Sequence, residues 1–304
     1  MNKLKMTKED LVVNTIAIVL GLFVLIITLY PFYLCLLRSF NEGQDAATGN
    51  LFFLPRKFTL MNYYIVLSDN ALIRSFAVTI LRTVIGTLSG LFFTSMVSYG
   101  LSKKNLLFRK GYSYMALITM YFSGGLIPGY LLLRNLHLLN NFLVYIIPGL
   151  FSYYYALLII AFYRELPDEI EESAKIDGAG DFYIFVRIIF PLSKPVLATI
   201  ALFLGVNHWN DWFTSAYYIS DQKLWTMPTI LMRVLSGVEG LNKINEMKGS
   251  VSGMNMGTLN SSSSVTLESI RYATLVVTVL PIILVYPFLQ KYFVKGMLVG
   301  SIKA

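Results

Sequence analysis

The chain has 304 residues, of which 56% are hydrophobic and 14% are charged, and its mean hydropathy is +0.62. Soluble domains carry about 25% charged residues, so this composition excludes an ordinary water-soluble protein and predicts a surface that faces lipid. The net charge is +8, but the basic residues are scattered or flank apolar segments, which indicates membrane topology rather than a nucleic-acid partner.

The chain has few residues that could bind a metal or form a disulfide. The chain has one cysteine, Cys35, and two histidines, His137 and His208, which stand far apart in the sequence. These residues cannot form a disulfide framework or a zinc site with recognised spacing. They also leave no nucleophile–base or metal set for an intramembrane enzyme. We therefore expect no catalytic residue and no metal in this chain.

Six apolar segments are long enough to cross a bilayer as helices, since a hydrocarbon core of ~30 Å needs about 20 residues. The first exceeds the apolar core of a signal peptide and is followed by no A-x-A pattern, so we expect an uncleaved anchor. Lipid offers no partner for free backbone groups, which predicts a helix in each segment and an all-α polytopic membrane protein of one domain, 1–304. The predicted spans are 11–37, 72–99, 112–133, 142–162, 195–213 and 273–292.

The short links between spans predict the topology. The link after the second span carries Lys103, Lys104, Arg109 and Lys110 with no acid, whereas the link after the third carries only Arg134. By the positive-inside rule the first link is cytoplasmic and the second external.

The remaining loops and both ends follow from that assignment. Both termini and the loop 164–194 become cytoplasmic, and the loops 38–71 and 214–272 become external. Residues 236–264 of the last loop end in a patch rich in Gly and Ser, which we expect to stay unstructured unless a partner holds it.

The cytoplasmic loop between the fourth and fifth spans is strongly acidic. Seven carboxylates lie within residues 165–181. Pro167 and the acids after it suit the first turn of a helix, where carboxylates complement the helix dipole. Gly178-Ala179-Gly180 should end this helix, and a second helix from Asp181 should place Phe182, Phe185 and Ile189 on one stripe until Pro191 stops it. The residues alone leave open an amphipathic connector at the membrane surface with no partner.

The same loop resembles a known motif. Glu172-Ser173-Ala174, three residues, Gly178, nine residues and Ile188-x-Phe190-Pro191 are similar to the EAA loop of the membrane subunits of bacterial ABC importers. Ser173 and Phe190 are mild departures from it. Residues 172–179, and Pro191-Leu192-x-x-Pro195 after them, resemble the carbohydrate-importer branch.

Most of the chain shares this resemblance. Residues 121–128 (YFSGGLIP) and the terminal KYFVKGMLVGSIKA are similar to permeases for complex oligosaccharides, and six spans with inside termini resemble the smaller permease of maltose-type importers.

The resemblance implies that the loop docks in a cleft of a separate ATPase and passes its closing motion to the spans. Glu172 would make an ionic or helix-end contact with that subunit, Gly178 would supply the bend, and Asp177 would cap or pair locally. The small side chains of Ala174 and Ala179 would allow close packing. The implied docking residues are Glu171, Glu172, Ala174, Asp177, Gly178 and Ala179.

The implied assembly has several subunits. The chain contains no G-x-x-x-x-G-K-[ST] phosphate loop, so it is not itself the ATPase, and ATP and Mg²⁺ would bind the partner ATPase with no cofactor in this chain. The expected partners are a second EAA-loop permease, two copies of the ATPase, an extracellular or periplasmic sugar-binding protein and membrane lipid. The expected location is the bacterial cytoplasmic membrane.

Polar residues at the end of the fifth span are candidates for the substrate path. By i,i+4 spacing Asn207 should share a face with Asp211, and His208 with Trp212. Amides beside indoles suit sugar hydroxyls and the apolar faces of sugar rings, but tryptophans near the outer interface are also ordinary aromatic-belt residues. The candidates are Asn207, Trp209, Asn210 and Trp212, and sugar contacts on the partner permease remain an alternative.

Further residues keep two interpretations each. Arg82, inside the second span, would either pair with an acid of the partner permease or extend toward the outer headgroups. Tyr153-Tyr154-Tyr155 would line a path or pack between helices. The loop 214–272 would contact the binding protein or serve as a linker.

An ion-coupled secondary transporter is the alternative function. Such proteins commonly show paired repeats and buried acids in broken helices, whereas here no Asp or Glu lies in the middle of a span and no inverted repeat is evident.

Overall fold

A computed structural model describes residues 8–47, 49, 51–237, 265–266, 268–281 and 283–284, which fall into two compact units. One unit comprises residues 1–69 and 233–280, and the other comprises residues 70–232 and 281–304. Every regular element among the described residues is a helix, apart from an isolated antiparallel bridge between Asn41 and Phe58, so the all-helical expectation is confirmed. Residues 238–264, part of the sixth predicted span (282 and 285–292) and the basic C-terminus lie outside the described residues.

The first unit begins with the long helix α1 (Lys8–Ser39), which contains the apolar segment predicted at 11–37. Its side chains from 11 to 33 are exposed, as expected for a helix that lipid surrounds. Two short helices follow, α2 (Gly43–Ala47) and α3 (Met61–Ser68), and residues 268–281 are also helical.

Buried amides hold the segment after α1. The Asn62 side chain donates hydrogen bonds to the carbonyl oxygens of Ser39 (2.9 Å) and Asn41 (3.0 Å), and it is fully buried. The Asn41 amide also donates to Asp45 (2.9 Å). That hydrogen bond, together with the Arg56 guanidinium, holds the pKa of Asp45 below its ordinary value.

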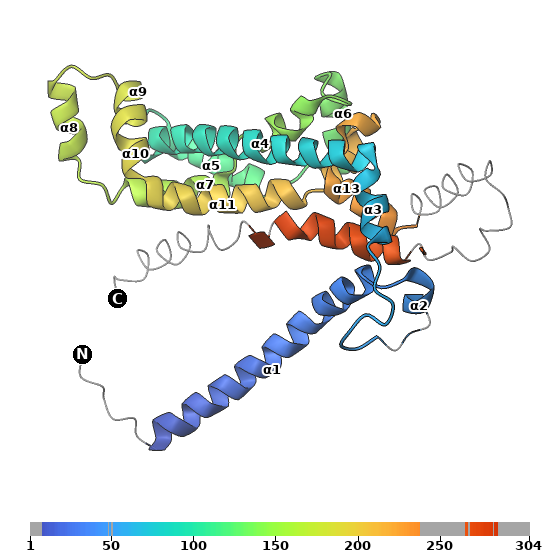
Figure 1. The fold of residues 1–304 in the computed structure, drawn as a ribbon. Coiled ribbons are helices and arrows are strands. Elements are labelled where there is room, and N and C mark those ends of the chain that lie inside the picture. The colour runs from blue at the N-terminus through green and yellow to red at the C-terminus, as the bar shows by residue number, and fades with distance from the viewer. Residues whose placement is uncertain are drawn as a thin grey trace. The chain divides into compact units, whose positions relative to one another are not determined.

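The second unit is built around α4 (Asn70–Ser102), α7 (Tyr153–Tyr163) and α11 (Lys194–Asn210), which lie side by side in Figure 1. Its other elements are α5 (Arg109–Tyr121), α6 (Leu126–Asn135), η1 (Phe142–Tyr145), η2 (Ile147–Gly149), α8 (Glu169–Ile176), α9 (Asp181–Ile184), η3 (Phe185–Ile189), α10 (Phe190–Leu192), α12 (Phe213–Tyr218), η4 (Gln222–Leu224) and α13 (Met227–Leu235).

Small residues let the other helices approach α4 closely. Along its buried face they recur mostly at intervals of three or four residues, as small residues do at helix interfaces in membranes. A Cβ on Gly86 would lie 2.7 Å from the His208 imidazole of α11, so a larger residue would require the imidazole to move. The buried members of this stripe are Ser75, Thr79, Gly86, Gly90, Thr94, Ser95 and Ser98.

The helices do not translate directly into a number of membrane spans. Among the described residues, α1 and α4 are long and apolar enough to cross a membrane, and three bent helix pairs raise that number to five if each pair is one span. The pairs are 109–121 with 126–135, 142–149 with 153–163, and 181–192 with 194–210. The six-span count therefore stays a prediction.

The third predicted span, 112–133, differs from the expected continuous helix. α5 ends at Tyr121, and α6 begins at Leu126 with its axis turned by 117°. Phe122 after α5 is extended, and Gly125, which directly precedes α6, has φ +85°, a conformation that glycine takes readily. The Ser123 hydroxyl accepts the Gly125 N–H (3.2 Å), so the freed donor is satisfied locally. Lipid therefore does not force one unbroken helix here.

The fourth and fifth predicted spans are also interrupted. Residues 142–149 form short 3₁₀ turns that meet α7 at 48°, and the helix of the fifth span ends at Asn210 rather than at 213. Pro148 falls inside the 3₁₀ turns, where its missing N–H prevents a regular α-helical ladder.

Candidate functional site

Helix α8 has the ends that the sequence predicts. Glu169, Glu171 and Glu172 lie in its first turn, where carboxylates complement the dipole. Gly178 has φ +81° and donates to the Lys175 carbonyl (3.0 Å), while the Ala179 N–H reaches the Ala174 carbonyl (2.9 Å). These two hydrogen bonds form a Schellman motif, so the left-handed glycine that closes α8 is confirmed.

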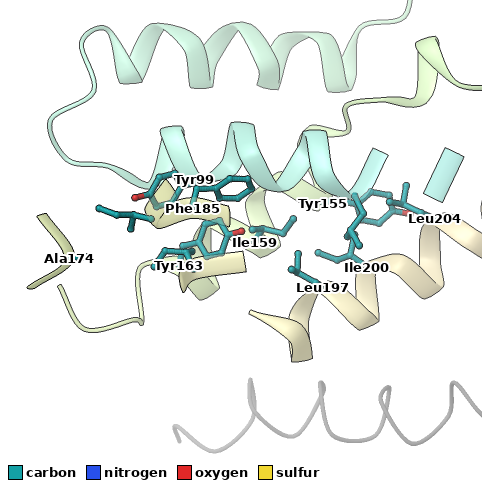
Figure 2. Packing of buried hydrophobic residues seen from close by; sticks show 12 residues of the cluster. Tyr99, Tyr155, Ile159, Tyr163, Ala174, Phe185, Leu197, Ile200 and Leu204 are labelled. Carbon is teal, nitrogen blue, oxygen red and sulfur yellow. The ribbon is translucent and has the colours of Figure 1, made fainter. Parts of the chain in front are cut away.

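The six predicted docking residues divide into an inner and an outer set. Ala174 is buried in the same apolar cluster as Tyr99 and Phe185, and Ala179 packs against that cluster (Figure 2). Glu172, Asp177 and Gly178 are exposed, and Glu171 is partly buried. The close packing around Ala174 is therefore with side chains of this chain, whereas the exposed set is free of the apolar cluster.

The helix after the glycine break is longer than predicted. We expected Pro191 to end it, but the helical turns continue from α9 through η3 and α10 to Leu192, and α11 then begins at 83°. η3 is a π-turn in which the Phe190 N–H reaches the Phe185 carbonyl. This wider turn relieves the clash that a proline makes with the preceding carbonyl, so Pro191 is accommodated.

The predicted apolar stripe is also partly wrong. Phe185 and Ile189 are buried as expected, but Phe182 is 65% exposed and Ile184 takes the buried position. The π-turn changes the angular spacing of side chains, which a regular helix period could not anticipate.

Two ion pairs join α8 to the basic turn that follows α4. The Lys103 ammonium donates to the Glu171 carboxylate, and the Lys104 ammonium lies 3.2 Å from the Asp168 carboxylate. Lys103 also lies over the Tyr99 ring, 4.1 Å from its centre. Partial burial lowers the pKa of Lys103, with the Asp181 and Asp168 carboxylates acting in the opposite direction. The loops predicted to share the cytoplasmic side therefore meet at one end of the unit.

Arg82 corrects both interpretations drawn from the sequence. It is 2% exposed and forms an ion pair with Asp211, whose carbonyl also accepts from Arg82 at 2.7 Å. Its guanidinium lies 4.6 Å from the centre of the Tyr145 ring. Arg82 therefore pairs inside its own chain, neither with another subunit nor with headgroups. A buried cation in a span needs an acid, and that requirement is the signal that could have singled out Asp211.

This ion pair also overturns the predicted faces of the fifth span. Asp211 follows the last residue of α11 with extended backbone, so it turns to Arg82 and does not continue the face of Asn207. His208 is buried against Gly86, whereas Trp212 is 37% exposed.

The four candidate path residues lie in different surroundings. Asn207 and Asn210 are exposed on one side of α11, and the Asn207 amide donates to the Tyr155 hydroxyl (2.9 Å). Trp209 packs edge-on against Phe76 (5.9 Å between ring centres), and its indole N–H is buried. Asn207, Asn210 and Trp212 therefore remain accessible candidates, while Trp209 is a packing residue.

The tyrosine triplet divides in the same way. Tyr153 and Tyr155 are buried and Tyr154 is 55% exposed. The Tyr155 ring stacks on Phe203 of α11, with 6.4 Å between ring centres. Helix packing therefore explains Tyr153 and Tyr155, whereas Tyr154 stays exposed next to Tyr155, with 5.5 Å between the ring centres.

Comparison with known proteins gives the family. Residues 11–299 match the family described as the binding-protein-dependent transport system inner membrane component. The chain belongs to this family.

Characterised relatives cover nearly the whole chain. It is 35% identical over 281 residues to the polygalacturonan/rhamnogalacturonan transport system permease protein YtcP of Bacillus subtilis (strain 168), covering 91% of this chain and 93% of the relative. It is 39% identical over 279 residues to the protein LplC of the same organism, covering 91% and 90%.

A solved structure agrees in fold. The chain superposes on one chain of a bacterial ABC transporter involved in the import of the acidic polysaccharide alginate, with a TM-score of 0.81 and 28% identity, covering 96% of this chain and 100% of the other. The acidic helix α8, the bent helix pairs and the α4–α7–α11 group thus belong to a permease. The alternative of an ion-coupled secondary transporter gains no support from these matches.

Proposed function

We propose that this chain is one membrane-spanning subunit of an ABC importer for a sugar or oligosaccharide, and that ATP hydrolysis by a separate subunit drives it through α8. The family, the polygalacturonan/rhamnogalacturonan permease among its relatives and the similar alginate importer support the carbohydrate class. The proposal places α8 and both termini in the cytoplasm of a bacterium and the loops 38–71 and 214–272 outside.

The single observation that carries the coupling role is the form of α8. Its first turn exposes Glu172, its end is closed by a left-handed glycine, and its inner side is fixed through Ala174. A helix held on one side and charged on the other suits docking against a second protein. An unpartnered surface connector would not need the buried alanine.

The subunit composition follows from the same proposal. A second EAA-loop permease forms the other half of the path, two ATPase copies bind ATP and Mg²⁺, and an external binding protein delivers the sugar. This chain then contributes no cofactor ligand and no catalytic group.

The exposed side of α11 is the proposed contribution to the path. Asn207 and Asn210 supply amides for sugar hydroxyls, while Tyr154 and Phe203 supply aromatic faces for sugar rings. Amides and aromatic rings of this kind contact the hydroxyls and ring faces of a sugar without an ion pair.

Co-purification tests the proposal. The tagged chain is isolated from its native membrane beside a Glu172→Lys/Gly178→Val double variant, with Glu165→Lys as control because Glu165 is an exposed acid outside α8. We expect an ATPase and a second permease with the wild type and with the control. The double variant should retain the permease and lose the ATPase. Wild-type chain that purifies alone and transports in vesicles without ATP would overturn the proposal.

A further inference from the structure

Few contacts attach α8 to the membrane helices. Ala174 is the buried residue that this eight-residue helix contributes, and Figure 1 shows α8 beyond the ends of α4 and α11, joined to α9 by a loop. Three ion pairs add to this contact: those with Lys103 and Lys104 lead to the end of α4, and the Lys175–Asp181 pair (3.1 Å) leads to α9. These ion pairs, the contact of Ala174 with the apolar cluster and the loop to α9 are the routes by which a movement of α8 reaches α4.

The two ion pairs with the α4 end differ in burial. The Lys103 and Glu171 side chains are 29% and 21% exposed, whereas those of Lys104 and Asp168 are 84% and 80% exposed. Exposed pairs are screened by water and salt and contribute little, while partly buried pairs are screened less. Lys103 is therefore the stronger of the two links.

Lys103 is also fixed to α4 itself. Its ammonium lies over the ring of Tyr99, one helical turn earlier, in cation–π geometry. Tyr99 is 7% exposed and packs against Phe185 (5.5 Å between ring centres) and Tyr163 (6.2 Å). One ammonium group thus joins the first turn of α8 to the aromatic cluster at the end of α4, and Figure 2 shows Tyr99, Phe185 and Tyr163 of that cluster.

The packing of α4 against α11 connects the aromatic cluster to the rest of the unit. α4 packs along α11, and the contact of Gly86 with His208 leaves no free space between them. Closely packed helices move together rather than deform. A displacement of the cytoplasmic end of α4 will therefore shift α11 and the side that carries Asn207 and Asn210.

We propose that Lys103 is the positioning residue that passes the displacement of α8 to α4 and on to α11, through its ion pair with Glu171. The inference rests on the proposed function, because the docked ATPase is the source of the displacement. Lys104→Gln is the matched control for Lys103→Gln. Each substitution removes one positive charge from the same turn, so the two variants carry equal signals for membrane topology.

Thiol labelling measures the displacement without knowledge of the sugar. The single native cysteine is removed by Cys35→Ser, and Val206→Cys places a thiol on the exposed side of α11, where Val206 is 41% exposed. The whole complex, purified from its native membrane, reacts with a water-soluble maleimide in the absence of nucleotide and with ATP plus vanadate. The measured quantity is the change in labelling rate that nucleotide causes.

The expected results separate the two lysines. Lys103→Gln should reduce the nucleotide-dependent change by roughly fivefold, the factor that corresponds to about 1 kcal/mol of lost coupling. Lys104→Gln and Lys103→Arg should leave it near wild type, and all three variants should still co-purify with the ATPase and hydrolyse ATP.

Three results would overturn the inference. Equal responses of Lys103→Gln and Lys104→Gln would remove the special role of Lys103. A labelling rate that is the same with and without ATP plus vanadate, in the protein with Lys103 and Lys104 intact, would show that the displacement does not reach α11. Absence of an ATPase from the wild-type complex would overturn the proposed function first, and this inference with it, so the two failures are distinguishable.

Discussion

At the scale of single residues, the buried charge of Arg82 shows how strongly a membrane protein must compensate a cation. Its guanidinium has a carboxylate, a carbonyl and an aromatic ring around it, all from its own chain. Asp211 in turn accepts from the Thr214 N–H (3.1 Å) and hydroxyl (2.5 Å). The pair therefore fixes the direction in which the chain leaves α11.

Removing one partner of this pair should destabilise the protein strongly. We expect Arg82→Met to lower the free energy of unfolding by about 3–5 kcal/mol, because it leaves the Asp211 carboxylate without its buried cation. Lys175→Gln, which breaks an exposed ion pair with Asp181, should cost less than about 1 kcal/mol. Thermal unfolding of the purified complex in detergent compares them, and equal midpoints would show that the Arg82 pair does not stabilise the fold.

The closing turn of α8 gives a second residue-scale prediction. Gly178→Ala forces a side chain into φ +81°, at a cost of about 1–2 kcal/mol. Gly180→Ala, two residues later, falls at φ −76° and should be tolerated. Neither added Cβ meets another atom within 4 Å, so the comparison isolates backbone conformation from packing. We expect Gly178→Ala to reduce recovery of the ATPase in co-purification, and recovery equal to that with Gly180→Ala would contradict this role.

At the scale of elements, α4 combines a lipid-facing apolar side with a stripe of small residues that faces α7 and α11. Leu81, Val84 and Leu88 are at least half exposed, while the nearby Gly86 and Gly90 are buried. The small residues bring backbones together, and hydroxyls such as that of Ser95, bonded to Tyr163 at 2.5 Å, add hydrogen bonds across the interface.

Two glycines of α4 test this packing within one helix. Gly86→Ala should destabilise the complex by about 1–3 kcal/mol, because the new methyl group would lie 2.7 Å from a buried imidazole. Gly100→Ala meets nothing within 4 Å and should be neutral or stabilising by about 0.5–1 kcal/mol, since alanine favours the helix. Thermal unfolding provides the measurement, and a harmless Gly86→Ala would show that α4 and α11 are not packed as described.

At the scale of the whole molecule, function depends on surfaces that this chain leaves uncovered. The exposed amides of α11 and the acidic side of α8 lie toward opposite ends of one helical unit, and α4 runs between them. A transporter needs this separation, because energy is applied at one end and the sugar is handled elsewhere.

The sugar path predicts an effect on affinity. Asn210→Ala should raise the apparent KM for uptake by about fivefold through the loss of a hydrogen bond worth about 1 kcal/mol. Trp209→Phe should leave KM near wild type, because Trp209 packs against Phe76 inside the unit. Uptake rates against concentration, for the oligosaccharide on which a strain lacking the chain fails to grow, give both values. An unchanged KM in Asn207→Ala and Asn210→Ala would place the sugar contacts on the partner permease.

The sequence alone determined the membrane class, the helical content, the acidic helix at 169–176 and its closure at Gly178. These features follow from local rules, because apolar length, charge near a helix start and glycine at a helix end act within a few residues. The same local rules failed at two places. At 112–133 the helix is broken, and the Ser123 hydroxyl accepts the hydrogen bond of the Gly125 N–H. At Pro191 a π-turn accommodates the proline, so the helix continues past it.

Only the tertiary structure decided which charges meet. Arg82 and Asp211 are 129 residues apart, and Lys103 and Glu171 are 68 residues apart, so no periodicity in the chain connects them. Their pairing depends on the register in which α4 packs against α11 and on the place where the loop after α7 returns. That register is set by the shapes of small residues facing larger ones, such as Gly86 against His208, and shape complementarity between distant segments exists only once the chain has folded.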